Sequence, residues 1–272
     1  MSGEKSLTSA DGRQVAPRVT SSDEPFPGAV QAAGAISLAV ILPVLNEAAT
    51  IAGQLCALQP LRQRGVTLIV VDGGSDDATV ELARPAVDTL LVAPRGRAWQ
   101  MNAGAAASEQ QTLLFLHADT RLPADAVEAI TRAVAEGARW GRFDVRIDGQ
   151  PLLLRLVERM INWRSRYTGI ATGDQAMFVH RATFVAVGGF PEQPLMEDIE
   201  LSLRLKRRAP PACLRQRVVT SARRWQQHGV LRTILLMWSL RARYFFGADP
   251  WQLARRYGYA PRPPDTGNGK QP

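Results

Sequence analysis

Two residues with side chains that can bind metal, His117 and Asp119, directly follow the apolar run Leu113–Leu116. Four apolar residues in a row predict a strand that is buried on both faces. A carboxylate is a hard ligand that suits Mg²⁺ or Mn²⁺, especially when diphosphate oxygens complete the coordination. His117 either joins Asp119 as a ligand or only forms a hydrogen bond there, and Asp119 alternatively caps the helix expected after Pro123.

A second polar group follows the apolar run 67–71, where Asp72 begins the sequence DGGSDD. The glycines allow the backbone to approach a ligand closely, and the Asp72 carboxylate can accept hydrogen bonds from the base or ribose of a nucleotide. The alternative is a turn in which Asp72 bonds its own loop. Asn46 and Glu47 follow an earlier apolar run in the same way.

Glu197 and Asp198 begin a predicted helix, MEDIELSLRLKRR, that ends in basic residues. The start of a helix favours the ionised form of a carboxylate, which a general base needs. Compensation of the helix dipole explains the same pattern, so both interpretations stay open. Further along, Arg223, Arg224 and Trp225 either clamp an anion and stack on a ring or only add to the surface charge.

Short apolar runs alternate with helical patterns in the first half of the chain. Such alternation predicts a parallel sheet with crossover helices, and ligands bind at the carboxyl ends of strands in such sheets. Asn46 and Glu47, Asp72, and His117 and Asp119 each follow a predicted strand. Strands are expected at 38–42, 67–71, 89–92 and 112–116, and helices at 48–58, 78–83, 98–107 and from Pro123 to Gly137.

The second half carries other patterns, with strands expected at 140–147 and 173–181 and an amphipathic helix at 152–167. A last helix, Val230 to Phe246, is rich in leucine, tryptophan, phenylalanine and arginine. This composition suits shallow insertion into an anionic membrane face, although an ordinary core helix has the same pattern.

The composition of the 272 residues, 46% of them hydrophobic, is that of a globular protein. The net charge is −5 over residues 1–138 and +13 over residues 139–272, so the second half is expected to face an anion. No nucleic-acid-binding motif accompanies the basic residues, and no nucleic-acid partner is expected. Cys56 and Cys213 fit no metal or redox spacing and are expected to be small buried residues of a reduced, cytoplasmic protein.

Taken in order, several segments resemble glycosyltransferase family 2, which has the GT-A fold. They are ILPVLNEAATI, VVDGGSDDAT, LLFLHADT, GGFPEQPLMEDIELSLRL and RRW. The resemblance implies an α/β fold with a mostly parallel central sheet flanked by helices. Longer segments, such as GRAWQMNAGA and TGIATGDQAMFVHR, are similar to the subgroup called radical-SAM/selenodomain-associated transferase 2.

The resemblance implies a metal-dependent inverting transferase that moves a sugar from a nucleotide-diphospho-sugar to an acceptor hydroxyl. Asp119 would hold the divalent cation, Mg²⁺ or Mn²⁺, and Asp198, with Glu197 beside it, would be the catalytic base. The donor site would include Asn46, Glu47, Asp72, Arg97, Asn102, His117, Arg223, Arg224 and Trp225. The acceptor would be a small molecule or a lipid-like compound.

Two positions depart from the family pattern. Gly73 stands where many members have a second aspartate, and His117 replaces the first aspartate of the Asp-X-Asp motif. His117 and His228 are therefore only secondary metal candidates. Two other functions remain as alternatives, a nucleotide-sugar binding module without catalysis and a nucleotidyltransferase.

The sequence predicts four regions. Residues 1–35 form a disordered segment without a signal peptide, and residues 36–228 form the catalytic domain, with a nucleotide-binding half at 36–138 and an acceptor half at 139–228. Amphipathic helices follow at 229–260, and 261–272 is a flexible tail. The expected location is the cytoplasm, with the inner face of the plasma membrane as an option.

Overall fold

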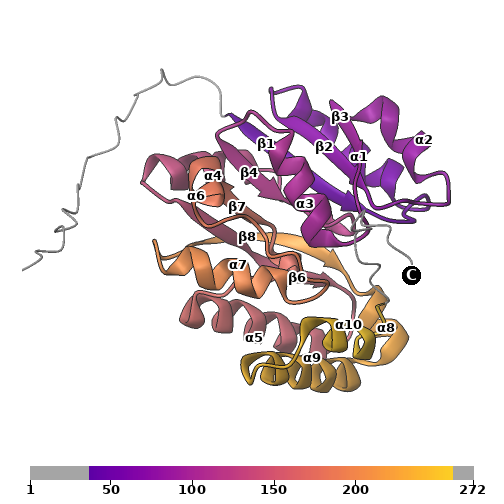
Figure 1. Cartoon of the computed structure of the whole chain (residues 1–272), viewed down its shortest axis with the longest axis vertical. Helices are drawn as coiled ribbons and strands as arrows, with labels where there is room; N and C mark the ends of the chain where they lie inside the picture. Colours follow the sequence, from indigo (N-terminus) through magenta and orange to yellow (C-terminus); the bar gives the residue numbers. More distant parts are fainter. Residues whose placement is uncertain (1–36, 260–272) are drawn as a thin grey trace, which may run out of the picture. The chain divides into compact units, whose positions relative to one another are not determined.

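The computed structural model of the chain describes residues 37–259. The predictions for residues 1–35 and 261–272 lie outside this range. The described residues form a single mixed sheet with helices on both faces (Figure 1). Its strands are β1 (Leu38–Val44), β2 (Thr67–Asp72), β3 (Thr89–Val92), β4 (Thr112–Phe115), β5 (Thr120–Arg121), β6 (Trp140–Asp148), β7 (Met177–His180) and β8 (Ala212–Ser221).

The strand order is β3-β2-β1-β4-β7-β6-β8-β5. The first four of these strands run parallel, β7 is antiparallel to both of its neighbours, and β6 pairs in parallel with β8. This arrangement confirms the predicted α/β fold with a mostly parallel sheet. The parallel strands place the ends of β1, β2 and β4 at the same edge, with Val44 of β1 beside Asp72 of β2.

The helices cover both faces of this sheet and one end of the described part. They are α1 (Ile51–Arg62), α2 (Thr79–Ala83), α3 (Arg97–Ala106), α4 (Ala126–Ala135), α5 (Leu152–Thr168), α6 (Arg181–Ala186), α7 (Glu197–Lys206), α8 (Arg223–His228), α9 (Val230–Phe245) and α10 (Pro250–Arg256). Two short 3-10 turns span Arg84–Ala86 and Gly173–Gln175.

Alternation along β1 explains the two layers of helices. Leu38, Val40 and Leu42 pack in the cluster that contains residues of α1 and α4, whereas Ala39 and Ile41 pack in the cluster that contains residues of α3, α6 and α7. Because successive strand residues point to opposite faces, a strand that is apolar throughout needs cover on both sides. The core therefore holds the strand ends rigidly at the polar edge.

Several predicted elements differ from the structure. The strand expected at 173–181 is only Met177–His180, because Gly173–Gln175 forms a 3-10 turn. The helix after Pro123 begins at Ala126. Strand β8 was not predicted, since its exposed half carries arginines and its pairing with β6 is irregular between Phe143 and Asp144. The cysteine prediction was wrong, because Cys56 is exposed and Cys213 is half-buried.

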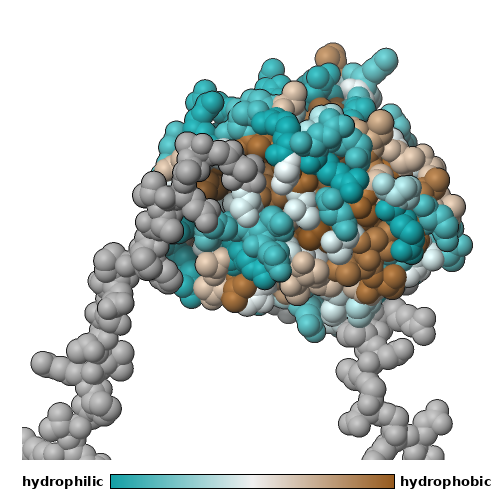
Figure 2. All heavy atoms as spheres, turned by 90° about the horizontal axis from the view of Figure 1, so that it is seen from above, coloured by the Kyte–Doolittle hydropathy of each residue, from teal (hydrophilic) through white to brown (hydrophobic). Residues whose placement is uncertain are grey.

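The described helices do not include one that is long and apolar enough to cross a membrane. The surface seen from above the view of Figure 1 mixes hydrophilic and hydrophobic residues (Figure 2). Exposed large apolar side chains are concentrated on α5 and α9. These two helices also share a small buried cluster, in which Val157 and Ile161 of α5 pack with Ile234 of α9.

Candidate active site at the strand ends

The loop after β2 is shaped by Asp72. The Asp72 Oδ2 atom accepts hydrogen bonds from the Gly74 N–H at 2.8 Å and the Ser75 N–H at 2.9 Å, and the Ser75 hydroxyl donates to Oδ1. Gly74 has a φ of +85°, a conformation that favours glycine. The turn interpretation of Asp72 is thus present in the structure, and the carboxylate reaches a nucleotide only if these bonds are shared or exchanged.

Asn46 connects the end of β1 to the same loop. Its backbone N–H donates to the Ser75 hydroxyl at 2.9 Å, and its side-chain oxygen accepts from the Asp76 N–H at 3.0 Å. Asn46 itself has a φ of +53°, which asparagine tolerates better than most residues. Asn46 and Asp72 therefore act together as the frame of one loop.

Gln100 of α3, which the sequence analysis did not select, joins the ends of β1 and β2. Its Nε2 atom donates to the Val44 carbonyl at 2.8 Å and to the Val71 carbonyl at 2.7 Å. The side chain is buried, and a Cβ atom at Gly73 would lie 3.1 Å from it. Gly73, where the family often has aspartate, thus leaves room for Gln100.

Asp119 lies at the margin of a cleft of about 550 Å³ that Arg223 of α8 also lines. Partial desolvation by the surrounding protein raises the pKa of the Asp119 carboxyl, and the negative charges of Glu47 and Asp174 raise it further. A carboxylate surrounded by other carboxylates favours a proton or a cation nearby. Asp174 was not predicted, and only its position beside Asp119 in the fold reveals it.

His117 occupies a different cavity from Asp119, although the two residues are separated only by Ala118. Its neighbours there include Gly173, Glu197 and Asp198. A methyl group at Gly173 would overlap the imidazole ring. Burial and the positive charge of Arg97 lower the pKa of His117 to about 3, so the ring is neutral at physiological pH.

Glu197 and Asp198 reach this cavity from the start of α7. The buried Glu197 lies 3.5 Å from the Nε atom of Arg97, and Asp198 accepts a hydrogen bond from the Gly173 N–H at 2.8 Å. Burial raises the pKa of Glu197 to about 7, and Asp198 adds to this shift while Arg97 opposes it. Burial lowers the pKa of Arg97, the negative charge of Glu197 raises it, and the net shift is upward. The structure therefore brings four predicted residues together, namely Arg97, His117, Glu197 and Asp198.

Asn102 is committed to a structural contact. Its side-chain amide donates to the Phe190 carbonyl at 2.9 Å and accepts from the Phe190 N–H at 3.0 Å. These bonds join α3 to the loop of Gly188, Gly189 and Phe190. They leave the amide little capacity to bind a nucleotide-sugar.

Only one of the four selected residues of α8 lines the Asp119 cleft, and that residue is Arg223. Arg224 lies over the ring of Tyr257 at 3.5 Å and donates to its carbonyl at 3.0 Å. Trp225 packs against the cluster of Leu154 and Val157. His228 is exposed at the end of α8 and is not among the residues that line the cleft.

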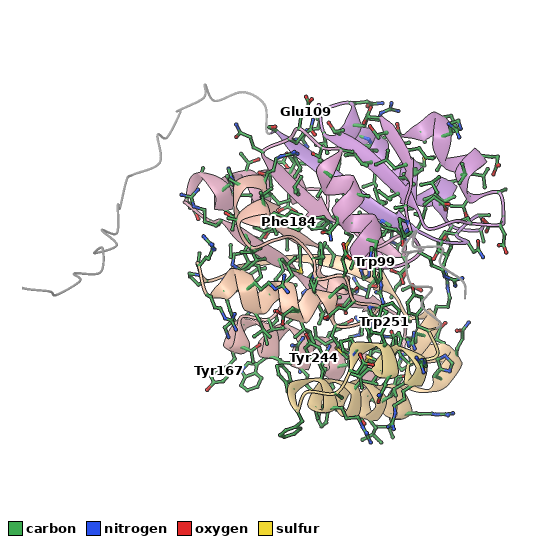
Figure 3. The ribbon with its side chains drawn as sticks, in the orientation of Figure 1. Trp99, Glu109, Tyr167, Phe184, Tyr244 and Trp251 are labelled. Atoms are coloured by element: carbon green, nitrogen blue, oxygen red, sulfur yellow. The ribbon has the colours of Figure 1, made fainter. Side chains whose placement is uncertain are left out.

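Aromatic residues near the end of the described chain lie close to the site. Trp251 of α10 packs against Trp99 of α3, with ring centroids 6.1 Å apart (Figure 3). Tyr257 and Tyr259 are near enough to Arg97 to affect its pKa. No local pattern in the sequence indicates these contacts, because they depend on how α10 packs against α3.

The family model for glycosyl transferase family 2 matches residues 39–184, which is more than half of the chain. The chain belongs to glycosyl transferase family 2. The matched range includes Asn46, Asp119 and Asp174 of the site described above. Helix α7, with Glu197 and Asp198, follows this range. No curated protein sequence matches this family 2 chain significantly.

Solved structures share the fold of this family 2 chain at low sequence identity. TarS 1–349 from S. aureus is 16% identical with a TM-score of 0.55, and the match covers 68% of this chain and 60% of that one. The mannosyltransferase PcManGT from Pyrobaculum calidifontis, solved with GDP-Man and Mn²⁺, is 18% identical with a TM-score of 0.55, covering 87% and 73%. Glucosyl-3-phosphoglycerate synthase from Mycobacterium tuberculosis, solved with Mg²⁺ and UDP, is 19% identical with a TM-score of 0.51, covering 67% and 69%.

The acidic residues of this family 2 site fit a divalent cation in part. Residues 37–259 contain no group of three or more histidine, cysteine or acidic side chains arranged to hold a metal. Mg²⁺, however, is commonly held by one or two carboxylates together with phosphate oxygens of a substrate. Asp119, with Glu47 and Asp174 nearby, offers the hard oxygen ligands that such shared coordination needs.

Proposed function

We propose that the chain is a metal-dependent inverting glycosyltransferase that uses a nucleotide-diphospho-sugar. The observation that carries this proposal is the arrangement of acidic groups near the end of β4, with Asp119 lining one cavity and the pair Glu197 and Asp198 lining a second cavity together with His117. Glycosyl transfer needs two kinds of carboxylate, one near the donor diphosphate and one to accept a proton. Membership of family 2 supports the reaction class.

The donor is expected along the ends of β1, β2 and β4. The loop framed by Asp72 and Asn46 offers backbone and side-chain groups to the nucleotide, and Glu47 lies close enough to Asp119 to affect its pKa. A cation held by Asp119 would neutralise the charge that develops on the diphosphate. Arg223 would add a positive charge from the far wall of the cleft.

Asp198 is the proposed base. The acceptor oxygen attacks the anomeric carbon, its proton passes to the Asp198 carboxylate, and the bond between the sugar and the diphosphate breaks in the same displacement. The hydrogen bond from Gly173 fixes the carboxylate beside His117. The ion pair of the buried Glu197 with the partly exposed Arg97 supports this position, and the neutral His117 ring adds no second positive charge beside it.

The acceptor is proposed to be lipid-like and presented at a membrane. Two neighbouring helices expose apolar side chains along one stripe each, which together we name the α5/α9 face (helices in Figure 1). Its residues are Leu152, Leu156, Met160, Trp163 and Tyr167 on α5, and Leu231, Leu235, Trp238 and Phe245 on α9. Aromatic and leucine side chains beside arginines favour shallow insertion into an anionic interface.

The finer identities stay predictions. The resemblance to the radical-SAM/selenodomain-associated transferase 2 subgroup names no substrate. The complexes of related folds with GDP-Man or UDP support a nucleotide donor of this general kind, without selecting the sugar.

A binding experiment tests the donor side of the proposal. Nucleoside diphosphates with Mn²⁺ are expected to raise the melting temperature of the wild type, because a ligand that binds the folded state stabilises it. Asp119→Ala should lose the part of this shift that depends on Mn²⁺. Asp125→Ala, an exposed position six residues on, is the control and should keep it. A metal-dependent shift of normal size in Asp119→Ala would refute the metal assignment.

A further inference from the structure

Arg164 of α5 is a half-buried cation with unpartnered hydrogen-bond donors. Its Nε and Nη2 atoms are shielded from solvent and have no hydrogen-bond partner within residues 37–259. Burying the donors of a charged group without partners is unfavourable, so such a group usually serves a ligand or a function. The residue as a whole is only half-buried, so part of it remains accessible to solvent.

The surroundings of Arg164 include a second arginine and the proposed base. Burial lowers the pKa of Arg164 to about 10, and the positive charge of Arg241 on α9 adds to the effect. The negative charges of Asp174 and Asp198 act in the opposite direction. Arg164 therefore lies in the same electrostatic environment as Asp198, on the side from which α9 approaches.

Two nearby arginines form the kind of ion pair that Arg164 lacks. Arg142 and Arg166 both form ion pairs with Asp144, the latter at 2.6 Å. Arg164 and Arg241 form no ion pair within the described part of the chain, although they are close enough for their charges to interact. Asp174 and Asp198 offset part of this positive charge, but neither forms an ion pair with Arg164 within the described residues, so the unpartnered donors of Arg164 remain available to an anion.

We infer that Arg164 and Arg241 bind a phosphate group of the acceptor, next to the hydroxyl that Asp198 would deprotonate. This inference rests on the proposed function, which it extends by naming the substrate class. Guanidinium groups suit phosphate because their planar donors form paired, charge-assisted hydrogen bonds. The donor diphosphate is not the ligand meant here, because neither arginine lines the cleft of Asp119 and Arg223.

The position of Arg241 relates this phosphate site to the α5/α9 face. Arg241 follows the exposed Trp238 by three residues and precedes the exposed Phe245 by four, spacings that place side chains on one side of a helix. A phosphate in a lipid headgroup would reach Arg241 while its acyl chains remain near the apolar stripe. A soluble phosphorylated acceptor has the same anionic chemistry, and the experiment separates these two sources.

Two variants test the site, Arg164→Gln and Arg241→Gln, with glycerol 3-phosphate as the soluble probe and thermal shift as the measure of its affinity. Arg243→Gln is the matched control, because Arg243 is exposed and its side chain, within residues 37–259, donates a hydrogen bond only to Ser239, at 3.4 Å. Asp119→Ala reports any binding of the probe in the donor cleft. Nucleoside diphosphate with Mn²⁺ is measured on every variant.

Each arginine variant is expected to bind glycerol 3-phosphate at least about tenfold more weakly, because it loses one or more charge-assisted hydrogen bonds. Arg243→Gln and Asp119→Ala should bind it as the wild type does. Equal affinity in Arg241→Gln and wild type, or no response of the wild type to the probe, would overturn the inference. Arg241 is half-exposed, so its variant remains informative if Arg164→Gln does not fold.

The nucleoside diphosphate measurement separates this inference from the proposed function. If the nucleotide binds normally and the affinity for glycerol 3-phosphate does not depend on the two arginines, only the inferred phosphate site is wrong. If the arginines hold the probe and no nucleotide binds, the proposed function fails and the phosphate site stands. Vesicles of phosphatidylcholine with and without phosphatidic acid give the source, since a headgroup ligand predicts weaker vesicle binding by Arg241→Gln than by Arg243→Gln.

Discussion

Neighbouring residues in the sequence serve different parts of this site. His117 and Asp119 follow the same strand, but His117 faces Gly173 and Asp198 while Asp119 faces the cleft with Arg223. The sequence leaves open whether His117 joins Asp119 as a ligand, and the structure places the two residues in different cavities. The histidine that replaces the family's first aspartate therefore lies in this second cavity, where a neutral ring fits between Arg97 and Gly173.

Glu197 predicts a pH dependence of stability. Its pKa rises from 4.5 to about 7 on folding, so the folded protein binds a proton that the unfolded chain releases. The free energy of unfolding should then fall as pH rises through this interval, by at most about 3 kcal/mol from this group. Glu197→Gln should remove the fall, because the amide cannot ionise.

Urea unfolding of wild type and Glu197→Gln between pH 4.5 and 8 measures this difference. Glu192→Gln, an exposed position in the preceding loop, is the control and should follow the wild type. Parallel curves for wild type and Glu197→Gln would show that Glu197 ionises normally in the fold.

Elements in this protein are joined by single amide side chains. Gln100 connects β1 to β2, and Asn102, one half-turn further along α3, connects that helix to Phe190. Helix α3 thus fixes the ends of β1 and β2 and the loop at Phe190 relative to each other. Amides suit this role because each one offers both donors and an acceptor to backbone groups that would otherwise be unpaired.

Asn102→Ala should destabilise the protein by about 2 kcal/mol, because the buried backbone groups of Phe190 lose both partners. Asn102→Asp keeps the acceptor and loses only the donor, so a smaller loss is expected. Denaturant unfolding measures both variants. Unchanged stability with weaker nucleotide binding would instead support the donor-site role predicted from the family resemblance.

The parallel half of the fold was predictable because its strands are uniformly apolar and end in polar residues. β3 was predicted with its observed bounds, 89–92, and β1 and β2 to within two residues. β8 was missed because it is an irregular strand. α10 was expected only as part of the amphipathic helices at 229–260, without bounds of its own, because its seven residues form only about two turns. Asp174, Gln100 and the pair Arg164 and Arg241 depend on contacts across the fold, which no local pattern in the sequence encodes.

At the scale of the whole molecule, the charge asymmetry and the α5/α9 face point to the same partner. The basic half of the chain, with a net charge of +13, contains both helices of this face. An anionic bilayer satisfies both features, because it offers negative headgroups at its surface and hydrocarbon beneath them.

The double variant Leu235→Ser with Trp238→Ser should weaken binding to phosphatidylglycerol vesicles about tenfold or more, through loss of buried apolar area. Co-sedimentation measures the binding, and added salt should reduce it for the wild type. Val92→Ser, an exposed apolar position on β3 with 71% of its surface accessible, is the control. Unchanged vesicle binding would contradict the membrane as the partner of this face. Loss of self-association in the double variant would instead assign the face to a second copy of the chain.

The release of nucleoside diphosphate from a panel of UDP- and GDP-sugars, with Mn²⁺ present, tests the proposed glycosyl transfer most directly. The wild type should release it from at least one donor, chelation or Asp119→Ala should suppress the release, and Asp198→Asn should bind the donor but turn it over about 10²-fold more slowly or worse. Glu200→Gln, which alters a carboxylate paired with Arg204 on the same helix, is the control. Release of pyrophosphate instead, no product from any donor, or full turnover by Asp198→Asn would contradict the proposed function.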